Sequence, residues 1–237
     1  MRIYWNPLEM IKEVERDLYE MGTRYQTATV QDQKVANDPD FMTIELYAYG
    51  YTLTSFSDIT SMIEHTHPND KEYVKWINYE IIERTNQQLY PLNPGKAWME
   101  RENFWKQFIR NGVFSYSYAE RWQQQIPYII NELKRFPNTR QAIITMYDQH
   151  QDMLNWGGLD RVPCSLSYQF LIRNDMLHCI YSQRSCDFIK FFAADVAITI
   201  GLLKYIASKL GIKYGYFTHF LGSLHAFAGD LKGRDIF

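Results

Sequence analysis

The chain has 237 residues, 46% of them hydrophobic, which excludes a disordered polypeptide and is enough for one domain with a large core. Its formal net charge of −2 argues against a dedicated nucleic-acid-binding protein, and its three cysteines lack the spacing of a zinc site or a disulfide framework. The N-terminus has no apolar signal-peptide core, so we expect a cytoplasmic protein. From the cysteine spacing we expect no bound metal.

The longest apolar run covers residues 188–210 and contains Lys190, Asp195, Lys204 and Lys209. A membrane span would have to bury these charges in hydrocarbon, which is costly. We therefore predict a core helix and no association with a membrane.

The spacing of apolar residues predicts the elements of the N-terminal half. The predicted helices cover residues 7–21, 70–87, 96–110 and 119–136, the last bent at Pro127. Runs of β-branched and aromatic residues predict strands over residues 42–53 and 141–147.

The C-terminal half carries the clearest pattern. Within residues 165–185, two strand-like runs flank Asn174 and Asp175, which suit a tight turn. This pattern predicts a β-hairpin. A helix and a strand are predicted next, over residues 196–210 and 214–221. Because strands and helices do not alternate regularly, we predict one α+β domain over residues 1–237, with a mixed or mostly antiparallel sheet.

A candidate nucleophile stands at the start of the predicted hairpin. Cys164 follows the loop formed by residues 156–163. A thiolate is a strong nucleophile when a nearby cation or hydrogen bond lowers the pKa of the thiol. The alternative is an inert core cysteine, since free cysteines are usually buried.

Three further segments carry side chains suited to a phosphorylated ligand. Arg184 and Ser185 can grip a phosphate by a charged fork and a hydroxyl, unless they form a solvated strand end. Arg140 offers a second cation, with a simple helix-to-strand turn as the alternative. His225 follows a turn-permitting Gly222, and it either donates to a sugar hydroxyl or is satisfied within the core.

These pieces, taken in order, resemble motifs of the thymidylate synthase family. Pro163–Cys164 matches the catalytic Pro-Cys of the family, and Gln183–Asp187 matches its QRSxD signature letter for letter. Three further segments are similar rather than identical: Tyr118–Trp122 resembles YGxxW, Asn138–Gln141 resembles DSRR, and Gly222–Phe227 resembles GDxHxY. The resemblance is good from about Tyr118 to Phe227 and weak before Glu80.

The resemblance implies a thymidylate synthase-like fold, with a buried central helix, flanking helices and a sheet face used for dimerisation. It implies that the Cys164 thiolate adds to C6 of a pyrimidine nucleotide, whose C5 attacks the one-carbon unit of 5,10-methylenetetrahydrofolate. Water then gives a hydroxymethyl product, or hydride from the folate gives a methyl product. No metal and no nucleic acid take part in this chemistry.

The same resemblance implies roles for residues around the nucleotide. Arg184, Ser185 and Arg140 would hold the phosphate, with Arg140 reaching the phosphate site of the partner subunit in an obligate homodimer. Gln183 and His225 would contact the nucleotide as well.

Other roles implied by the resemblance concern the base and the folate. Asp187 matches a residue at the folate and base end of the pocket, and Trp105 resembles a tryptophan on the folate side. Tyr118 would line the cavity near Cys164. Glu80 is the best match for a catalytic glutamate that orders water near the base, with an exposed helix face as the alternative.

Asp195 stands where synthases of this family carry Asn. That Asn reads uracil, donating to O4 and accepting from N3–H, whereas cytosine has an acceptor at N3 and a donor at N4. A neutral carboxylic acid matches the cytosine edge, and burial at the start of an apolar helix would raise the pKa of Asp195. Deoxycytidylate hydroxymethylases of bacteriophages carry Asp here, and they carry Gly-Ser-Leu-His, as in residues 222–225. A helix N-cap aspartate is the alternative.

Several departures from the family refine the expected activity. Phe227 replaces a Tyr that helps to bind the sugar, and Ser165 replaces the His after the catalytic cysteine. The chain ends at Phe237, ten residues after Phe227, where synthases continue into a tail over the folate. A shorter lid would admit water, which favours hydroxymethylation. We therefore expect a phage-type dCMP 5-hydroxymethyltransferase. The alternatives are a dCMP 5-methyltransferase, a dUMP-specific synthase or hydroxymethylase, and an inactive relative that binds nucleotide or RNA.

Overall fold

The computed structural model describes residues 1–30, 33–86, 93–155 and 161–232. Part of the loop expected before Cys164 lies outside these ranges, as does the last residue of the helix expected over residues 70–87.

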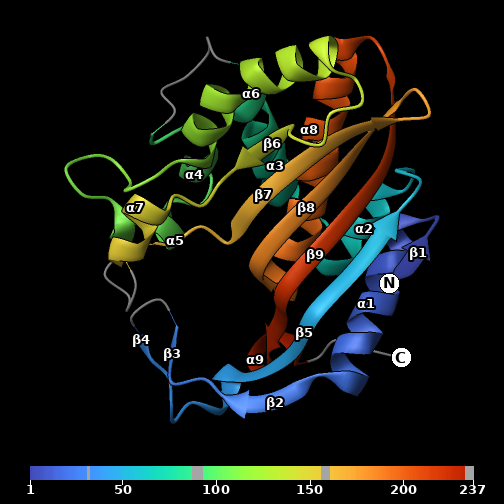
Figure 1. Ribbon diagram of the computed structural model, residues 1–237. Helices are drawn as coiled ribbons and strands as arrows, with labels where there is room; N and C mark the ends of the chain where they lie inside the picture. The colour runs from blue at the N-terminus through green and yellow to red at the C-terminus, as the bar shows by residue number, and fades with distance from the viewer. Residues whose placement is uncertain (31–32, 87–92, 156–160, 233–237) are drawn as a thin grey trace.

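A mixed sheet forms the centre of the described part of the chain (Figure 1). Its strands follow the order β1-β5-β9-β8-β7-β6, and β2 pairs with β5 outside this path. Pairs β1–β5 and β8–β9 are parallel, and the other pairs are antiparallel. The bounds are β1 Arg2–Tyr4, β2 Thr23–Gln26, β5 Met42–Leu53, β6 Ile143–Thr145, β7 Ser165–Arg173, β8 Met176–Asp187 and β9 Lys213–Phe227. A separate hairpin joins β3 Thr29–Val30 to β4 Gln33–Lys34.

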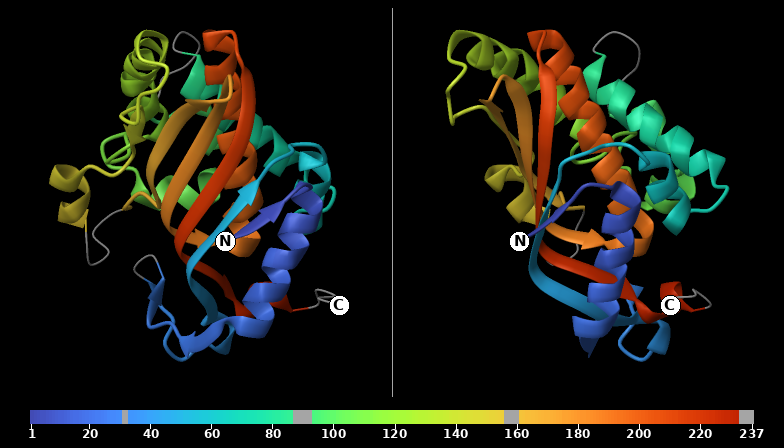
Figure 2. Two further views of the ribbon diagram at one scale, coloured as in Figure 1. Left: turned by 45° about the vertical axis from the view of Figure 1, so that its right-hand side comes forward. Right: turned by 90° about the vertical axis from the view of Figure 1, so that its right-hand side faces the viewer.

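Helices cover one face of this sheet, so the predicted α+β class with a mixed sheet is confirmed. The right-hand view of Figure 2 shows α8 lying against the strands and α3 packed outside it. The helices are α1 Pro7–Met21, α2 Ile59–Thr66, α3 Lys71–Thr85, α4 Lys96–Met99, α5 Glu102–Trp105, α6 Tyr118–Arg135, α7 Gln149–Asp152, α8 Ala193–Leu210 and α9 Ala228–Leu231.

Helix α8 is the buried centre of the fold. The segment Phe188–Leu210 is long and apolar enough to cross a membrane, yet 67% of its most apolar window is buried inside the molecule. It contacts β8 and β9 on one side and α2, α3 and α6 on the other. A helix that is apolar on all sides is expected in the core of a protein. The sequence predicted a core helix here because a membrane span would have to bury the charged residues of this segment.

The other face of the sheet carries exposed aromatic side chains. Along β9, Phe217, His219 and Leu221 face the core, while Tyr216 and Phe220, at alternate positions of the strand, are 48% and 44% exposed. This alternation follows from the two-residue period of a strand. One face of the central strands is therefore left uncovered in a single chain.

Local sequence patterns predicted several bounds correctly. Helix α1 and strand β5 have the predicted limits, and the hairpin β7–β8 turns at Asn174 and Asp175, whose φ angles are 52° and 58°. The strand predicted over residues 214–221 is longer, because β9 continues along β5 as far as Phe227.

The helix predicted over residues 96–110 is wrong. The chain forms α4 and α5 instead, followed by a 3-10 turn at Lys106–Phe108. The break falls at Arg101, whose guanidinium lies 4.6 Å from the ring centroid of Trp76 and 5.2 Å from that of Phe191. Tertiary stacking of a cation on aromatic rings outweighs the helical spacing here.

Candidate active site

The residues singled out in the sequence lie mostly at one end of the sheet. Cys164 precedes β7, and the segment Gln183–Asp187 ends β8 beside it. Asp195 lies in the first turn of α8, Glu80 in α3 and Tyr118 at the start of α6. The electrostatic influences between them, described below, show that these segments meet in space.

Cys164 is fixed through its own backbone. Its N–H donates to the hydroxyl of Tyr118 at 3.0 Å, and its carbonyl accepts from the N–H of Arg184 at 2.8 Å. The Arg184 side chain returns to the same loop, donating from Nε to the carbonyl of Pro163 at 2.8 Å. Burial raises the pKa of the Cys164 thiol, while the charges of Arg184 and Arg161 act in the opposite direction. Both cations therefore favour a thiolate at this position.

The close approach of β9 to β8 beside this loop depends on Gly222. A Cβ atom at this position would lie 2.8 Å from the carbonyl oxygen of Arg184. Any other residue would push β9 away from the strand that carries Arg184 and Ser185.

Asp195 is not the N-cap of its helix. The N-cap of α8 is Phe192, and a one-turn π-helix at Phe188–Phe192 precedes it. The Asp195 carboxyl turns toward the sheet, where its Oδ2 accepts from Gln183 Nε2 at 2.7 Å and from the thiol of Cys186 at 3.6 Å. Burial raises its pKa to about 6, against the lowering effect of the Gln183 hydrogen bond and of Arg84. A neutral carboxyl group is therefore accessible near neutral pH.

A chain of buried hydrogen bonds leads from Asp195 into the core. Gln183 Oε1 lies 3.0 Å from Nε2 of His219, whose Nδ1 lies 3.0 Å from the hydroxyl of Tyr51. Gln183 is 3% exposed, and His219 and Tyr51 are fully buried. Burial lowers the pKa of His219 to about 3, so its ring is neutral.

Glu80 is held from two sides. Trp76 Nε1 donates to one carboxylate oxygen at 3.2 Å, and Arg84 Nη2 donates to the other at 2.7 Å. The Arg84 guanidinium also lies 4.9 Å from the ring centroid of Tyr118. The charge of Glu80 raises the pKa of Asp195, so the two carboxyl groups lie near enough to interact, and the Glu80 side chain is only 18% exposed. The exposed helix face considered for Glu80 is therefore wrong.

Glu83, on the same helix as Glu80, holds the start of α4. Its carboxylate accepts from the backbone N–H of Ala97 at 2.7 Å, at the start of α4. Burial raises its pKa to about 7, while the backbone bonds to Ala97 and Lys96 oppose this. A Cβ at Gly95 would lie only 2.2 Å from the Glu83 carboxylate, so this contact requires a glycine there.

Asp187 and His225 are neighbours on paired strands. The register of β8 and β9 places them opposite each other. Burial raises the pKa of Asp187, opposed by Lys190, and burial lowers the pKa of His225. Lys190 Nζ lies 3.6 Å from Asp187, and 5.2 Å from the ring centroid of Phe227, the residue that replaces the expected Tyr.

Two predicted residues lie at the margin of this cluster. Trp105, at the end of α5, has its ring centroid 6.1 Å from that of Phe191, and the Arg161 guanidinium lies 4.3 Å from it. Arg161 links Trp105 to Cys164, because it acts on the pKa of that thiol. Ser185 is half-buried on β8, where the register places Ser223 opposite it.

Arg140 does not join the cluster within one chain. It is exposed before β6, and its carbonyl accepts from Gln169 at 2.9 Å. The backbone bond from Phe170 to Ala142 places it beside the far half of β7, whereas Cys164 precedes the first residue of that strand. At ~3.3 Å per residue the distance along β7 from Cys164 to Phe170 is roughly 20 Å, beyond the reach of an arginine side chain.

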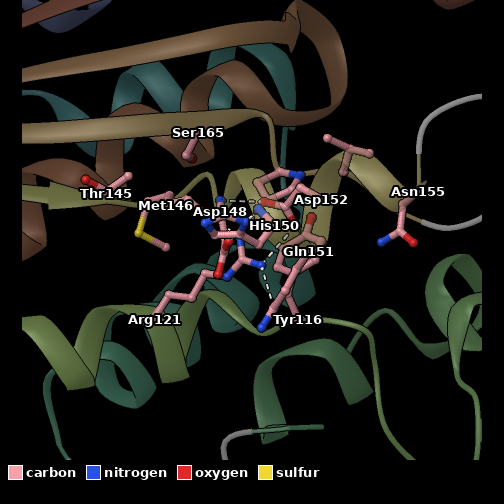
Figure 3. Close-up of polar contacts among 12 residues, drawn as sticks. Tyr116, Arg121, Thr145, Met146, Asp148, His150, Gln151, Asp152, Asn155 and Ser165 are labelled. Atoms are coloured by element: carbon pink, nitrogen blue, oxygen red, sulfur yellow. Dashed lines mark hydrogen bonds and ion pairs between the residues drawn. The ribbon is translucent and has the colours of Figure 1, made fainter.

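The sequence did not reveal an ion pair that supports the start of α6. Arg121 donates to both oxygens of Asp152, at 2.8 Å and 2.9 Å, and its guanidinium lies 4.7 Å from the ring centroid of Tyr116 (Figure 3). It also donates to the carbonyl of Met146. The Asp152 side chain is 1% exposed, so the pair is buried and bidentate. It ties the helix that carries Tyr118 to the segment leading toward Cys164.

Four other residues of the site were missed for different reasons. Arg84 and Arg161 lie outside the matched motifs, so the motif search could not find them. Tyr51 and His219 lie in strands at core positions, and local sequence does not distinguish a hydrogen-bonded core residue from a packed one. No group of three or more possible metal ligands occurs among the described residues.

Comparisons with known proteins agree on one family. The model of the family described as thymidylate synthase matches residues 69–233. A putative thymidylate synthase of Methanocaldococcus jannaschii is 32% identical over 173 residues, covering 66% of this chain and 77% of that protein. A putative thymidylate synthase of Methanococcoides burtonii is 28% identical over 185 residues, covering 76% and 77%.

Solved structures show the same fold. Thymidylate synthase A from Bacillus subtilis superposes with a TM-score of 0.68 at 16% identity, over 94% of this chain and 80% of that one. Thymidylate synthase from T4 phage gives a TM-score of 0.67 at 18% identity, over 93% and 77%.

Proposed function

This chain belongs to the thymidylate synthase family, and from that premise we propose that it is a dCMP 5-hydroxymethyltransferase. It would use 5,10-methylenetetrahydrofolate as co-substrate and supply a modified cytosine nucleotide for DNA. The observation that carries the choice of base is the environment of Asp195, whose pKa burial raises to about 6.

Recognition of cytosine follows from the two oxygens of a neutral Asp195. The Oδ1–H donates to N3 of the base, and the other oxygen accepts from the amino group at C4. Uracil presents N3–H and a carbonyl oxygen instead, so both contacts become repulsive. Gln183 supports this arrangement, because its amide already holds Oδ2 as an acceptor.

Cys164 is the proposed nucleophile. Its backbone is fixed by Tyr118 and Arg184, and the charges of Arg184 and Arg161 favour the thiolate that adds to C6. As the bond forms, negative charge develops at C5 and spreads through C4 to N3. The proton at Asp195 Oδ1 lies where that charge arrives, so the residue that reads the base also stabilises the adduct.

The residues present fit a folate on one side of this pocket. Trp105, Phe191 and Phe108 form an aromatic wall suited to a flat ring system, and Arg161 lies over Trp105. When bound there, 5,10-methylenetetrahydrofolate supplies the one-carbon unit. We also assign Asp187 to this end, which its contact with Lys190, the residue before Phe191, supports.

Glu80 is the proposed residue that holds the attacking water. Each of its oxygens is occupied by one fixed donor, from Trp76 or from Arg84, and each keeps a lone pair for a water molecule. Its influence on the pKa of Asp195 supports a position near the base, where a water adding to the one-carbon unit must lie.

One chain does not supply all the cations that we propose for binding the nucleotide phosphate. Arg184 and Ser185 are available, with Arg184 exposed. Arg140 lies too far along β7 to reach this site in its own chain, so we propose that it reaches the phosphate of a partner subunit. The uncovered sheet face with Tyr216 and Phe220 is where a second copy would pack, giving a cytoplasmic homodimer.

The test is product mass spectrometry after incubation with equal dCMP and dUMP and methylenetetrahydrofolate. A hydroxymethylated cytosine nucleotide supports the proposal. A methylated cytosine product keeps Asp195 as the base reader but overturns the water step. A uracil product overturns the base assignment, and no product from either nucleotide indicates a relative that only binds.

The matched variant is Asp195→Asn, which keeps the size of the side chain and restores an amide. We expect the preference, measured as a ratio of kcat/KM values, to shift toward dUMP by about 10- to 100-fold, the range of one bidentate base contact. An unchanged ratio would mean that Asp195 does not read the base.

A further inference from the structure

A buried chain of hydrogen bonds joins Tyr51, His219, Gln183 and Asp195. Tyr51, at one end of it, determines in which direction the donors point. We infer that Tyr51, acting through His219 and Gln183, is a positioning residue that places the acidic proton of Asp195 on Oδ1 and thereby sets the preference for cytosine over uracil. This inference deepens the proposed function and rests on it.

The chain can in principle be polarised in two ways. In the forward sense, the Tyr51 hydroxyl donates to Nδ1 of His219, Nε2–H of His219 donates to Oε1 of Gln183, and the Gln183 amide donates to Oδ2 of Asp195. In the reverse sense every donor becomes an acceptor, and Asp195 donates from Oδ2 to Gln183. Distances of 3.0, 3.0 and 2.7 Å fit both senses.

Tyr51 decides between them. In the forward sense its O–H has an acceptor, Nδ1 of His219. In the reverse sense that nitrogen carries a proton, and the buried O–H of Tyr51 has no other acceptor among the residues that the structure describes. An unpaired buried donor is disfavoured. Because the ring of His219 is neutral, only one of its nitrogens carries a proton, so one choice at Tyr51 fixes the whole chain.

The forward sense determines which oxygen of Asp195 bears the acidic proton. Oδ2 receives the Gln183 amide at 2.7 Å, and the Cys186 thiol, a weak donor, lies 3.6 Å away, so Oδ2 can still accept from the amino group of the base. The carbonyl oxygen of a neutral carboxyl group is its stronger acceptor, so Oδ2 is the carbonyl and the proton lies on Oδ1. No described residue donates to Oδ1. The pocket therefore meets N3 of the base with a donor, which suits cytosine.

In the reverse sense, Asp195 would present an acceptor to the base instead of a donor. With its proton on Oδ2 directed at Gln183, Asp195 would offer Oδ1 as a bare acceptor, which suits N3–H of uracil. The preference between the bases thus depends on a hydroxyl in β5 that does not touch the nucleotide. A purely structural role for Tyr51 would change stability and leave the preference as it is.

The test compares Tyr51→Phe with Tyr49→Phe. Tyr49 lies on the same strand, and its hydroxyl donates to Asp17 at 2.8 Å, away from Asp195, so it controls for loss of one internal hydroxyl. Dissociation constants for dCMP and dUMP are measured by calorimetry without folate, which removes turnover from the readout. We expect the dUMP-to-dCMP ratio of dissociation constants to fall about five- to tenfold in Tyr51→Phe, the value of one hydrogen bond. It should remain unchanged in Tyr49→Phe.

A second variant and a second readout keep the inference falsifiable. His219→Phe keeps a ring between Tyr181 and Phe192, which stack on His219 at interplanar angles of 15° and 22°, and it cuts the chain completely. It should lose the preference at least as strongly as Tyr51→Phe. Nuclear magnetic resonance of the histidine nitrogens in the unliganded wild type should show the Nε2–H tautomer of His219.

The outcomes separate the inference from the proposed function. An unchanged dCMP preference in Tyr51→Phe and in His219→Phe overturns the inference while the proposed function stands. An Nδ1–H tautomer of His219 in the wild type overturns it as well. If the wild type prefers dUMP, the proposed function fails, and an Nε2–H tautomer together with that preference also refutes the link between polarity and base choice.

Discussion

The proposed base end and the proposed phosphate end of the nucleotide site differ in how much of their geometry one chain fixes by itself. At the base end, Asp195 is tied to Gln183 and, through His219, to Tyr51 in the core. At the proposed phosphate end, Arg184 is exposed, and its guanidinium donates to the backbone carbonyls of Pro163 and Val162, in the loop before Cys164.

This difference has a physical reason. A base is distinguished by the direction of a few hydrogen bonds, so the groups that read it must be held in one orientation by buried partners. A phosphate is recognised by charge, which tolerates exposed and adjustable side chains. The core can therefore supply specificity at one end, while affinity at the other end is left to cations, which we propose include Arg140 of a second copy.

The largest expected effect is the loss of turnover in a variant that keeps both ends of the nucleotide site. Cys164→Ala should lower kcat by about 10⁴-fold or more, because loss of a nucleophile removes its covalent route. Binding of dCMP, measured by calorimetry, should stay within a few-fold of the wild type. Cys179 is a buried cysteine of β8. The variant Cys179→Ala is therefore the control and should keep its activity. Full turnover by Cys164→Ala would refute the mechanism.

The next effect concerns the framework of the Cys164 side of the pocket. Asp152→Ala leaves Arg121 buried without its bidentate partner, which should lower the free energy of unfolding by about 3–5 kcal/mol in urea titrations. Asp148→Ala in the same segment removes the half-buried N-cap of α7 and a charge that acts on Arg121 without a direct ion pair, and should cost about 1 kcal/mol. Equal losses in both variants would show that the buried pair contributes nothing special.

How well the sequence predicted these features depended on whether their cause is local. Helix α1, strand β5 and the hairpin were predicted because periodicity and turn residues act over short distances. The helix expected over residues 96–110 was wrong, because Arg101 stacks on Trp76 and Phe191, which lie in other elements.

The candidate site shows the same division. Contiguous motifs led to Cys164, Arg184 and Asp195, and the fold brings them to one end of the sheet. The neutral state of Asp195 was predicted from apolar surroundings, and burial does raise its pKa. The partners that orient its carboxyl, His219 and Tyr51, come from distant strands, so their role becomes visible only through the register of the sheet.

The pH dependence of binding tests the base end directly. With a pKa of about 6, Asp195 is neutral below that pH and ionised above it. Cytosine requires the neutral form, so dCMP binding should weaken as pH rises from 6 to 8, approaching tenfold per pH unit. The ratio of dCMP to dUMP affinities is the quantity to measure, since titration of the phosphate cancels in it.

Other groups around Asp195 shape that curve. Those whose electrostatic influence reaches it, or which feel its charge, are Glu80, Arg84, Tyr51, Tyr73, Cys164, Tyr168, Tyr181 and Cys186. The Asp195→Asn variant has no acid at this position, so its ratio should be flat over the same range. A wild-type ratio that is equally flat would contradict recognition by a neutral Asp195.

Arg184 tests the phosphate end. Arg184→Met should weaken dCMP binding by about tenfold, the modest value of an exposed charge-assisted contact. It should leave binding of deoxycytidine, which has no phosphate, nearly unchanged. Arg135→Met, an exposed cation at the end of α6, is the control and should alter neither. Equal weakening of nucleotide and nucleoside would mean that Arg184 supports the pocket rather than the phosphate.

The smallest expected effect lies between the two ends, at Arg161. Its charge opposes the rise in the pKa of the Cys164 thiol that burial causes. Arg161→Met keeps an apolar side chain beside Trp105 but removes that charge, so the thiolate fraction at a given pH should fall. Alkylation of Cys164 by iodoacetamide at neutral pH should slow by about two- to fivefold, the size of a partly screened charge interaction.

Salt distinguishes this charge effect from a change of shape. Added salt screens Arg161, so it should slow alkylation of the wild type and affect Arg161→Met less. Cys164→Ala gives the background from Cys179 and Cys186, which are both buried. If alkylation of Arg161→Met follows the wild-type pH profile, Arg161 serves only as a partner for Trp105 at the folate side. Activation of the nucleophile would then rest on Arg184, and one exposed arginine would act on both the phosphate and the thiolate.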